Sequence, residues 1–339
     1  MADDAGFDEP EMSWSTQDFE QKIGFTGGRY TETNAFFTFL VGLIMATVFF
    51  LFLEFVIGDS GPEKEWAENN PVSVLDDDGN PKMDPKTGEP VTKGAEKPFH
   101  IFISNKFINE DLIGWSGYSV AAAISVLFFW SCTILFVKGR KVKFQRKALA
   151  LNLVPQDPNF FLNTATAREA LLRIRGAVDD TSHFLLLNRI EVALSNLQNI
   201  GQISDVSSIV SAQASMDEDQ VSSSYSLLNG FLWAIPVLGF IGTVLGLGSA
   251  IGAFGGAIAA ASDMEALKGE LTKVTEGLKT AFDTTLLGLL GSMIVQIVVT
   301  FRKRQEFLLL DECNEYCQTY VLSKLRLEKG GGARDRGGR

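Results

Sequence analysis

Two threonines lie within long apolar stretches, where hydroxyl groups are uncommon. A hydroxyl in such a place can bind an ion or a water molecule. Thr243 lies in residues 231–258, which carry no charge, and Thr285 lies in residues 282–301, whose single charge is Asp283. A hydroxyl oxygen can hydrogen-bond a water that carries a proton, and it can also coordinate a sodium ion. The two threonines therefore predict either an ion path or hydrogen bonds that hold two helices together.

Each threonine belongs to a stripe of small or polar residues at helical spacing. The stripes are Gly239, Thr243, Gly246, Ala250 and Ala253 on one stretch, and Ala281, Thr285, Gly288, Ser292 and Gln296 on the other. Steps of three and four residues place each set on one helix face. Polar groups in membrane helices usually face the bundle interior or a water-filled cavity. One interpretation is close helix packing alone, and the other is a thin water-lined path between two facing stripes.

The elements that position these threonines are membrane-spanning helices. A bilayer span needs about 20 apolar residues, and four stretches qualify, namely residues 36–57, 117–137, 230–258 and 278–301. The first follows a long acidic segment rather than a short basic one, so we do not expect a cleaved signal peptide. The predicted fold is all-α, a polytopic membrane protein with four transmembrane helices, the last two extended by cytoplasmic helices.

Lysines and arginines near the span ends predict the orientation. Basic runs follow the second span at residues 138–147 and the fourth at residues 302–304. Loops rich in lysine and arginine stay in the cytoplasm, so both termini should be cytoplasmic. The predicted cytoplasmic segments are residues 1–35, the helical domain 138–229, the C-terminal helix 302–328 and a glycine-rich disordered tail, 329–339. Residues 58–116 and the connection 259–277, expected as a short amphipathic helix, should face the periplasm.

The predicted periplasmic loop is acidic and rich in turn-forming residues. Its run DDDGNPKMDPKTGEP suggests a small hairpin or an irregular flap. Asp76, Asp78 and Asn80 have the spacing of a calcium loop, but Pro81 replaces the required glycine and no closing glutamate follows. We therefore expect no metal there. Glu54, near the end of the first span, is expected to extend toward the membrane interface.

Several function classes are disfavoured by composition. The net charge of −11 disfavours nucleic-acid binding, which needs a basic surface. Cys313 and Cys317 lie one helical turn apart without further metal ligands nearby, so reduced thiols are expected. The glycines at 246, 248 and 252 lie inside an apolar span, whereas a dinucleotide loop must follow a strand in a soluble unit. No catalytic constellation is evident, so neither enzyme activity nor a cofactor is expected.

Two sequence runs resemble a known family. IPVLGFIGTVLGLGSAIGAF resembles the third membrane helix of the MotA/TolQ/ExbB proton-channel family, and EGLKTAFDTTLLGLLGSMIV resembles the helix that follows it. The resemblance is most specific over residues 227–301, within a family domain expected at about 200–320. It implies that Thr243 and Thr285 are pore threonines, with the neighbouring Thr284 also on the ion path.

The same resemblance indicates further candidate residues for the ion path, and the chain differs from the family pattern at one position. ExbB and TolQ have a glutamate near the start of the second helix where this chain has Thr280, and Asp283 follows three residues later. Asp283 and Ser292 are thus possible members of the path. The residues expected to serve helix packing are Pro236, Gly239, Gly242, Gly246, Gly288 and Gly291.

The resemblance implies a function and partners. The family forms rings of five such chains around a dimer of a single-span partner of ExbD, TolR or MotB type, which carries a membrane aspartate. The chain would then be an ion-channel subunit of a motor in the bacterial inner membrane that couples proton flow to mechanical work. The alternatives are a sodium-driven version, a non-conducting membrane scaffold, or a sensor whose acidic loop binds a ligand. Beyond these partners, only the lipid bilayer is expected.

Overall fold

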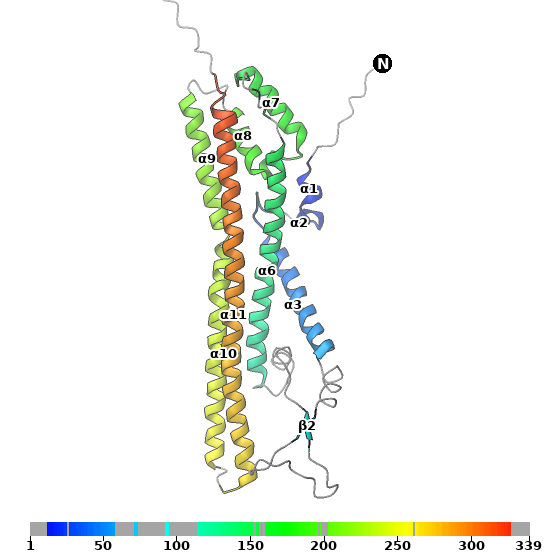
Figure 1. Cartoon of the computed structure of the whole chain (residues 1–339), viewed down its shortest axis with the longest axis vertical. Coiled ribbons are helices and arrows are strands. Elements are labelled where there is room, and N and C mark those ends of the chain that lie inside the picture. Colours follow the sequence, from blue (N-terminus) through cyan, green and yellow to red (C-terminus); the bar gives the residue numbers. More distant parts are fainter. Residues whose placement is uncertain are drawn as a thin grey trace, which may run out of the picture. The chain divides into compact units, whose positions relative to one another are not determined.

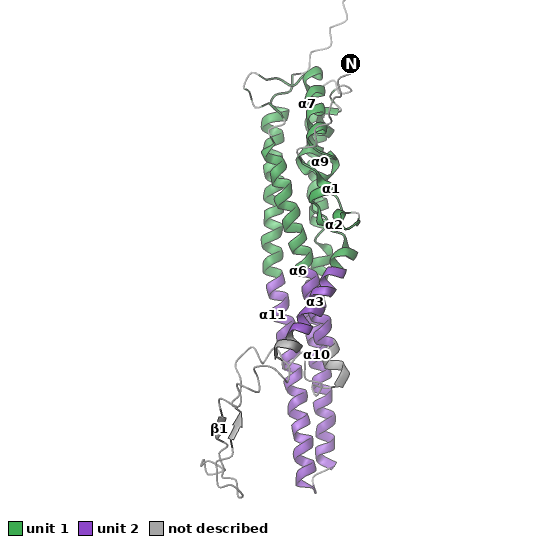
Figure 2. Cartoon of the chain, turned by 90° about the vertical axis from the view of Figure 1, so that its right-hand side faces the viewer, with its two compact units in different colours: residues 1–39, 132–230, 296–339 green, residues 40–131, 231–295 purple. Residues whose placement is uncertain are grey.

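The structure is a computed structural model. It describes residues 12–25, 27–57, 71–73, 92–94, 114–151, 154–155, 157, 160–195, 197, 203–259 and 262–326. The chain forms two compact units (Figure 2). Unit 1 comprises Met1–Phe39, Cys132–Gly230 and Gln296–Arg339, and unit 2 comprises Leu40–Ser131 and Phe231–Val295. The tail, Asp76, Asp78, Asn80 and the side chain of Glu54 lie outside the described part.

Four helices in the described part are long and apolar enough to cross a membrane (Figure 1). They are α3 (Ala35–Ile57), α6 (Gly114–Ala150), α10 (Ser226–Ala259) and α11 (Met264–Tyr316). The predicted fold class, an all-α polytopic membrane protein with long third and fourth spans, is confirmed. Strands β1 (Pro71–Ser73) and β2 (Thr92–Gly94) form an antiparallel pair in the loop where a hairpin or flap was expected.

Unit 2 is held together by close helix contacts between apolar faces. A Cβ atom on Gly42 of α3 would lie 2.7 Å from Trp130 Cα of α6, so only glycine permits this approach. Trp130 in turn lies 4.5 Å, between ring centroids, from Phe231 of α10. A core of Val120, Ile124 and Ile235 is joined by Leu127, Leu238 and Leu287, so α6, α10 and α11 share one apolar centre.

Two helices extend further than the sequence patterns indicated. Helix α6 continues through the basic run to Ala150. Helix α11 runs unbroken over 53 residues from Met264, so the run MEALKGELTKVTEGL is helical as expected but continues directly into the fourth span. Asp263 begins α11 by accepting the Glu265 N–H at 3.0 Å. No proline occurs in α11, and its glycines are not enough to stop a helix that is packed against its neighbours.

Unit 1 consists of shorter helices around the polar halves of α6 and α11. They are α1 (Trp14–Gln17), α2 (Phe19–Lys22), α7 (Thr164–Ala177), the 3-10 turn η1 (Thr181–His183), α8 (Leu185–Ser195), α9 (Ile203–Ser223) and the π-helical η3 (Cys317–Leu322). Asn163 begins α7 with a capping box. Gln145 of α6 accepts the Leu185 N–H at 3.0 Å and thereby positions the start of α8.

Candidate functional site

The two threonines singled out by the sequence lie against each other in unit 2. Helices α10 and α11 run side by side, and the hydroxyls of Thr243 and Thr285 are in direct hydrogen-bond contact. The two predicted stripes therefore face each other within one chain. The closest hydroxyl contact joins residues that are 42 positions apart in the sequence.

The threonine pair is built from two matching helical turns. Thr243 Oγ1 lies 3.1 Å from the Ala281 carbonyl oxygen, and Thr285 Oγ1 lies 3.1 Å from the Gly239 carbonyl oxygen. Each of these carbonyls belongs to the residue four positions before the opposite threonine. Two hydroxyls and two carbonyls consequently form a compact group of four oxygens between the helices. The glycine and alanine at the base of each turn allow the two backbones to approach closely.

Because the two threonines are partly exposed, their oxygens can bind water or a cation. Both Thr243 and Thr285 are half-buried. A hydroxyl has one proton to donate and two lone pairs that accept. The two protons therefore allow one hydroxyl–hydroxyl bond and one bond to a carbonyl at a time, and lone pairs of the hydroxyls remain available to another donor or a cation. Such oxygens can accept a hydrogen bond from water or coordinate a cation without a charge of their own.

Thr284 is placed differently from its neighbour. It is buried, and its hydroxyl donates to carbonyls of its own helix, those of Thr280 at 3.0 Å and Ala281 at 3.2 Å. Its side chain also fills the space where a Cβ on Gly242 would lie. Its hydroxyl also lies 3.5 Å from the Gly239 carbonyl oxygen of α10, so Thr284 is enclosed between the two helices and suits helix packing.

The predicted packing glycines lie where α10 and α11 approach most closely. An added Cβ would lie 3.0 Å from the Thr284 carbonyl oxygen at Gly239, and 3.0 Å from the Ile235 carbonyl oxygen at Gly288. At Gly246 it would lie 2.8 Å from the backbone of both Ala281 and Gly277. Gly277 was not among the predicted packing residues, although an added Cβ there would lie 2.8 Å from Ala250 N. Gly291 is less restricted, with Phe128 Cδ2 the nearest atom at 3.7 Å.

These distances predict that alanine substitutions at two glycines of α10 affect protein stability differently. We expect Gly246→Ala to destabilise the protein by about 1–3 kcal/mol, the typical cost of overpacking, because its methyl group would overlap rigid backbone. Gly248 has no atom within 4 Å of an added Cβ, so Gly248→Ala should be neutral. The midpoint of thermal unfolding in detergent measures both. Equal behaviour of the two variants would contradict the close α10–α11 contact.

The remaining candidates lie on other parts of α11. Asp283 is buried, 9 % exposed, and it precedes Leu287 by one helical turn, on the side that packs toward the core shared with α6. It lies two positions before Thr285, which places the two residues on roughly opposite sides of the helix. Ser292 donates to the Leu289 carbonyl of its own helix at 3.0 Å. The structure thus brings Thr243 and Thr285 together and directs Asp283 elsewhere.

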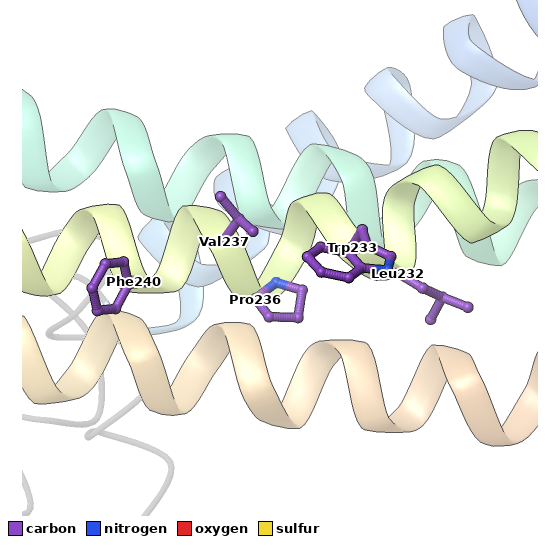
Figure 3. Close-up of a pocket in the computed structure, with 5 residues that line it drawn as sticks. All are labelled: Leu232, Trp233, Pro236, Val237 and Phe240. Atoms are coloured by element: carbon purple, nitrogen blue, oxygen red, sulfur yellow. The ribbon is translucent and has the colours of Figure 1, made fainter.

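Pro236 lies beside an apolar groove on α10. Leu232, Trp233, Pro236, Val237 and Phe240 line this groove, which has a volume of about 400 Å³ (Figure 3). Proline lacks an N–H, so it leaves the carbonyl one turn earlier without its usual helical partner. The side chains of Trp233 and Phe240 are 78 % and 64 % exposed, as expected for a surface that meets lipid or another membrane helix.

One buried polar cluster in unit 1 was missed by the sequence analysis. Lys138 of α6 lies 3.2 Å from Glu306 Oε1 of α11, and the two residues are 0 % and 1 % exposed. Thr31 donates to Glu306 Oε2 at 3.2 Å, and Lys138 donates to Ser224 Oγ at 2.9 Å. The Lys138 ammonium also lies 4.4 Å from the ring centroid of Tyr225. In the sequence Lys138 and Glu306 are part of charged runs, so nothing local distinguished them from solvent-exposed residues.

The fold and the threonine pair define a multi-pass helical membrane protein with an uncharged, oxygen-lined contact between its last two spans. Residues 186–312 match the model of the MotA/TolQ/ExbB proton channel family, so the family resemblance drawn from the threonine runs is confirmed over this range. No curated protein and no solved structure matches the chain. The matched family is one of channels rather than enzymes.

Proposed function

We propose that this chain is an ion-channel subunit of an inner-membrane motor of the ExbB, TolQ and MotA type. The observation that carries the proposal is the half-buried Thr243–Thr285 pair, which lies within the region that matches the proton-channel family. Two hydroxyls held against two carbonyls present oxygens to an ion at the level of the membrane. The proposal rests on this placement together with the family match.

The ion-carrying acid would come from a partner. Asp283, two positions before Thr285 in the sequence, is buried and lies on another side of α11. A single-span protein of ExbD, TolR or MotB type, with an aspartate on its membrane helix, would supply the missing carboxylate beside Thr243 and Thr285. Ion flow would protonate and release that aspartate in turn. Each event would change which chain of the ring pairs with it, so that the ring steps around a dimer of the partner.

A sodium-driven version is the second candidate. The hydroxyls of Thr243 and Thr285 and the carbonyls of Gly239 and Ala281 form a group of four neutral oxygens, and hard cations prefer oxygen ligands. A proton would instead pass through water bonded to the same hydroxyls. A third candidate, a scaffold that conducts nothing, would use the hydroxyls solely as contacts between helices.

The proposed assembly is a homopentamer in the bacterial inner membrane, with both termini in the cytoplasm. Supporting the assembly, α10 and α11 each present a long exposed apolar face in the single chain, with Phe240, Val244, Ile251 and Phe254 on α10 and Phe282, Leu289 and Met293 on α11. Part of these faces would meet neighbouring chains and part would meet lipid. Supporting the orientation, the basic residues after the second and fourth spans follow the positive-inside rule.

Purification with a single-span partner tests assembly and function together. We expect native mass spectrometry to show five copies of this chain with two of the partner, and the complex in liposomes to pass ions down a gradient. Flux under a proton gradient alone would identify the proton, and flux under a sodium gradient alone would identify sodium. A monomer or dimer would contradict the ring, and a pentamer without flux under either gradient would favour the scaffold.

A further inference from the structure

The segment that precedes α3 lies outside the family match and is folded against unit 1. Trp14 is 1 % exposed, with its ring 5.5 Å from those of Phe144 and Phe184. Asp179 accepts the backbone N–H groups of Trp14 at 2.9 Å and Ser15 at 3.0 Å. These contacts position α1 and, through it, the short helix α2 that follows.

The acidic side chains of this segment are turned inward. Glu20 and Asp18 are 0 % and 5 % exposed, and Lys141 Nζ lies 2.5 Å from Glu20 Oε2 and 3.4 Å from Asp18 Oδ2. Burial raises the pKa of Glu20 above its ordinary value, although the Lys141 charge acts to lower it. Because these carboxylates face Lys141, the exposed charges of residues 12–39 in the described part are those of Lys22 and Arg29, while Glu32 is half-buried.

The outward side of the same segment is apolar. Phe19, Ile23 and Phe36 are 50 %, 52 % and 63 % exposed. The buried Phe37 lies beneath, with its ring 6.0 Å from that of Phe19 and 5.3 Å from that of Phe25, and the Phe25 ring lies 6.2 Å from that of Phe36. Ile23 follows Phe19 by one helical turn and shares its side of α2. We call Phe19, Ile23, Phe25 and Phe36 the N-terminal apolar patch.

The position of this patch along the chain indicates what covers it. Asn34 begins α3 by accepting the N–H groups of Phe36 and Phe37, and the part of α3 that is apolar enough to span a membrane begins at Ala35. The N-terminal apolar patch is therefore continuous with the first turn of this span, where we expect the bilayer to start. Aromatic side chains with neighbouring basic residues are characteristic of segments that lie in a membrane interface.

We propose that the N-terminal apolar patch inserts into the headgroup boundary of a leaflet that contains anionic lipid. Phe19, Ile23 and Phe36 would enter the acyl-chain boundary, and Lys22 and Arg29 would bind lipid phosphates. The inward pairing with Lys141 removes two of the carboxylates that would oppose this, those of Asp18 and Glu20. The segment would thus fix the depth of α3 in the bilayer, whether or not the chain conducts ions.

Spin-label depth measurement on the full chain tests the proposal. With Cys132, Cys313 and Cys317 replaced by alanine, a label is placed at Ile23→Cys, and the matched control is Gln17→Cys on the exposed side of α1. In nanodiscs of phosphatidylcholine and phosphatidylglycerol, we expect the ratio of oxygen to nickel-complex accessibility to be several-fold higher at position 23. Equal ratios at both positions would overturn the proposal. Low accessibility to both reagents at position 23 would also overturn it, because a neighbouring protein chain would then cover the patch.

Two further measurements complete the test. If the cysteine-free chain does not fold, Phe19→Trp in the native background is compared with wild type, and brominated lipid should quench the added fluorescence. Lys22→Gln combined with Arg29→Gln should shift the label at position 23 toward water, as should nanodiscs of phosphatidylcholine alone. If neither change alters the depth of the label, the anionic-lipid part of the proposal is overturned.

Discussion

Valine at position 285 is expected to abolish ion flux while leaving the assembly intact. Thr285→Val keeps the size of the side chain and removes the hydroxyl that contacts Thr243 and lies 3.1 Å from the Gly239 carbonyl. The loss of stability should be small, because a hydrogen bond between membrane helices is worth about 0.6 kcal/mol. The measurement is ion flux into liposomes that hold the complex, with native mass spectrometry to show that the pentamer and its partner persist.

Variants of nearby hydroxyls separate an ion path from helix packing. Thr243→Val should also lower flux severely, since it removes the other half of the pair. Thr284→Val should retain far more flux than Thr285→Val, because Thr284 is buried whereas Thr285 is half-buried. Ser292→Ala, whose hydroxyl bonds the Leu289 carbonyl, should be similarly mild. Wild-type flux in both Thr243→Val and Thr285→Val would refute the path and leave the hydroxyls as contacts between helices.

Removing one charge of the buried Lys138–Glu306 pair in unit 1 is expected to cause the largest loss of stability. Glu306→Leu would leave the Lys138 ammonium, which is 0 % exposed, without its carboxylate. Removing one partner of a buried ion pair costs about 3–5 kcal/mol. Lys138→Met together with Glu306→Leu should recover most of that loss, because both charges are then absent and their volume is kept. Thermal unfolding of the purified protein in detergent measures each single variant and the double variant.

A surface ion pair of the same unit provides the control. Arg173 lies 2.7 Å from Glu169 on α7, and the two side chains are 55 % and 64 % exposed. Exposed pairs at this spacing contribute about 0.3–0.5 kcal/mol, so Glu169→Gln should leave the unfolding midpoint almost unchanged. A double variant at Lys138 and Glu306 that is less stable than both single variants would show that the pair acts through contacts other than its charges.

Several features follow from the sequence by itself. The four spans follow from local hydrophobicity and the thickness of a bilayer, and the stripes through Thr243 and Thr285 follow from the period of a helix. The family resemblance follows from the same short runs. These features are predictable because each depends on residues within a few helical turns of one another.

Other features depend on contacts that no local pattern contains. Thr284 and Thr285 are adjacent and chemically identical and both contact α10, yet one is buried and the other half-buried, because the packing of α11 against α10 covers them to different extents. Likewise, Lys138 and Glu306 are separated by 168 positions, and each belongs to a charged run typical of a solvent-exposed surface. Their burial, like the inward pairing of Glu20 with Lys141, is decided when distant segments pack together. The sequence alone therefore determines the spans and the candidate threonines, whereas tertiary packing decides which hydroxyls and charges remain accessible.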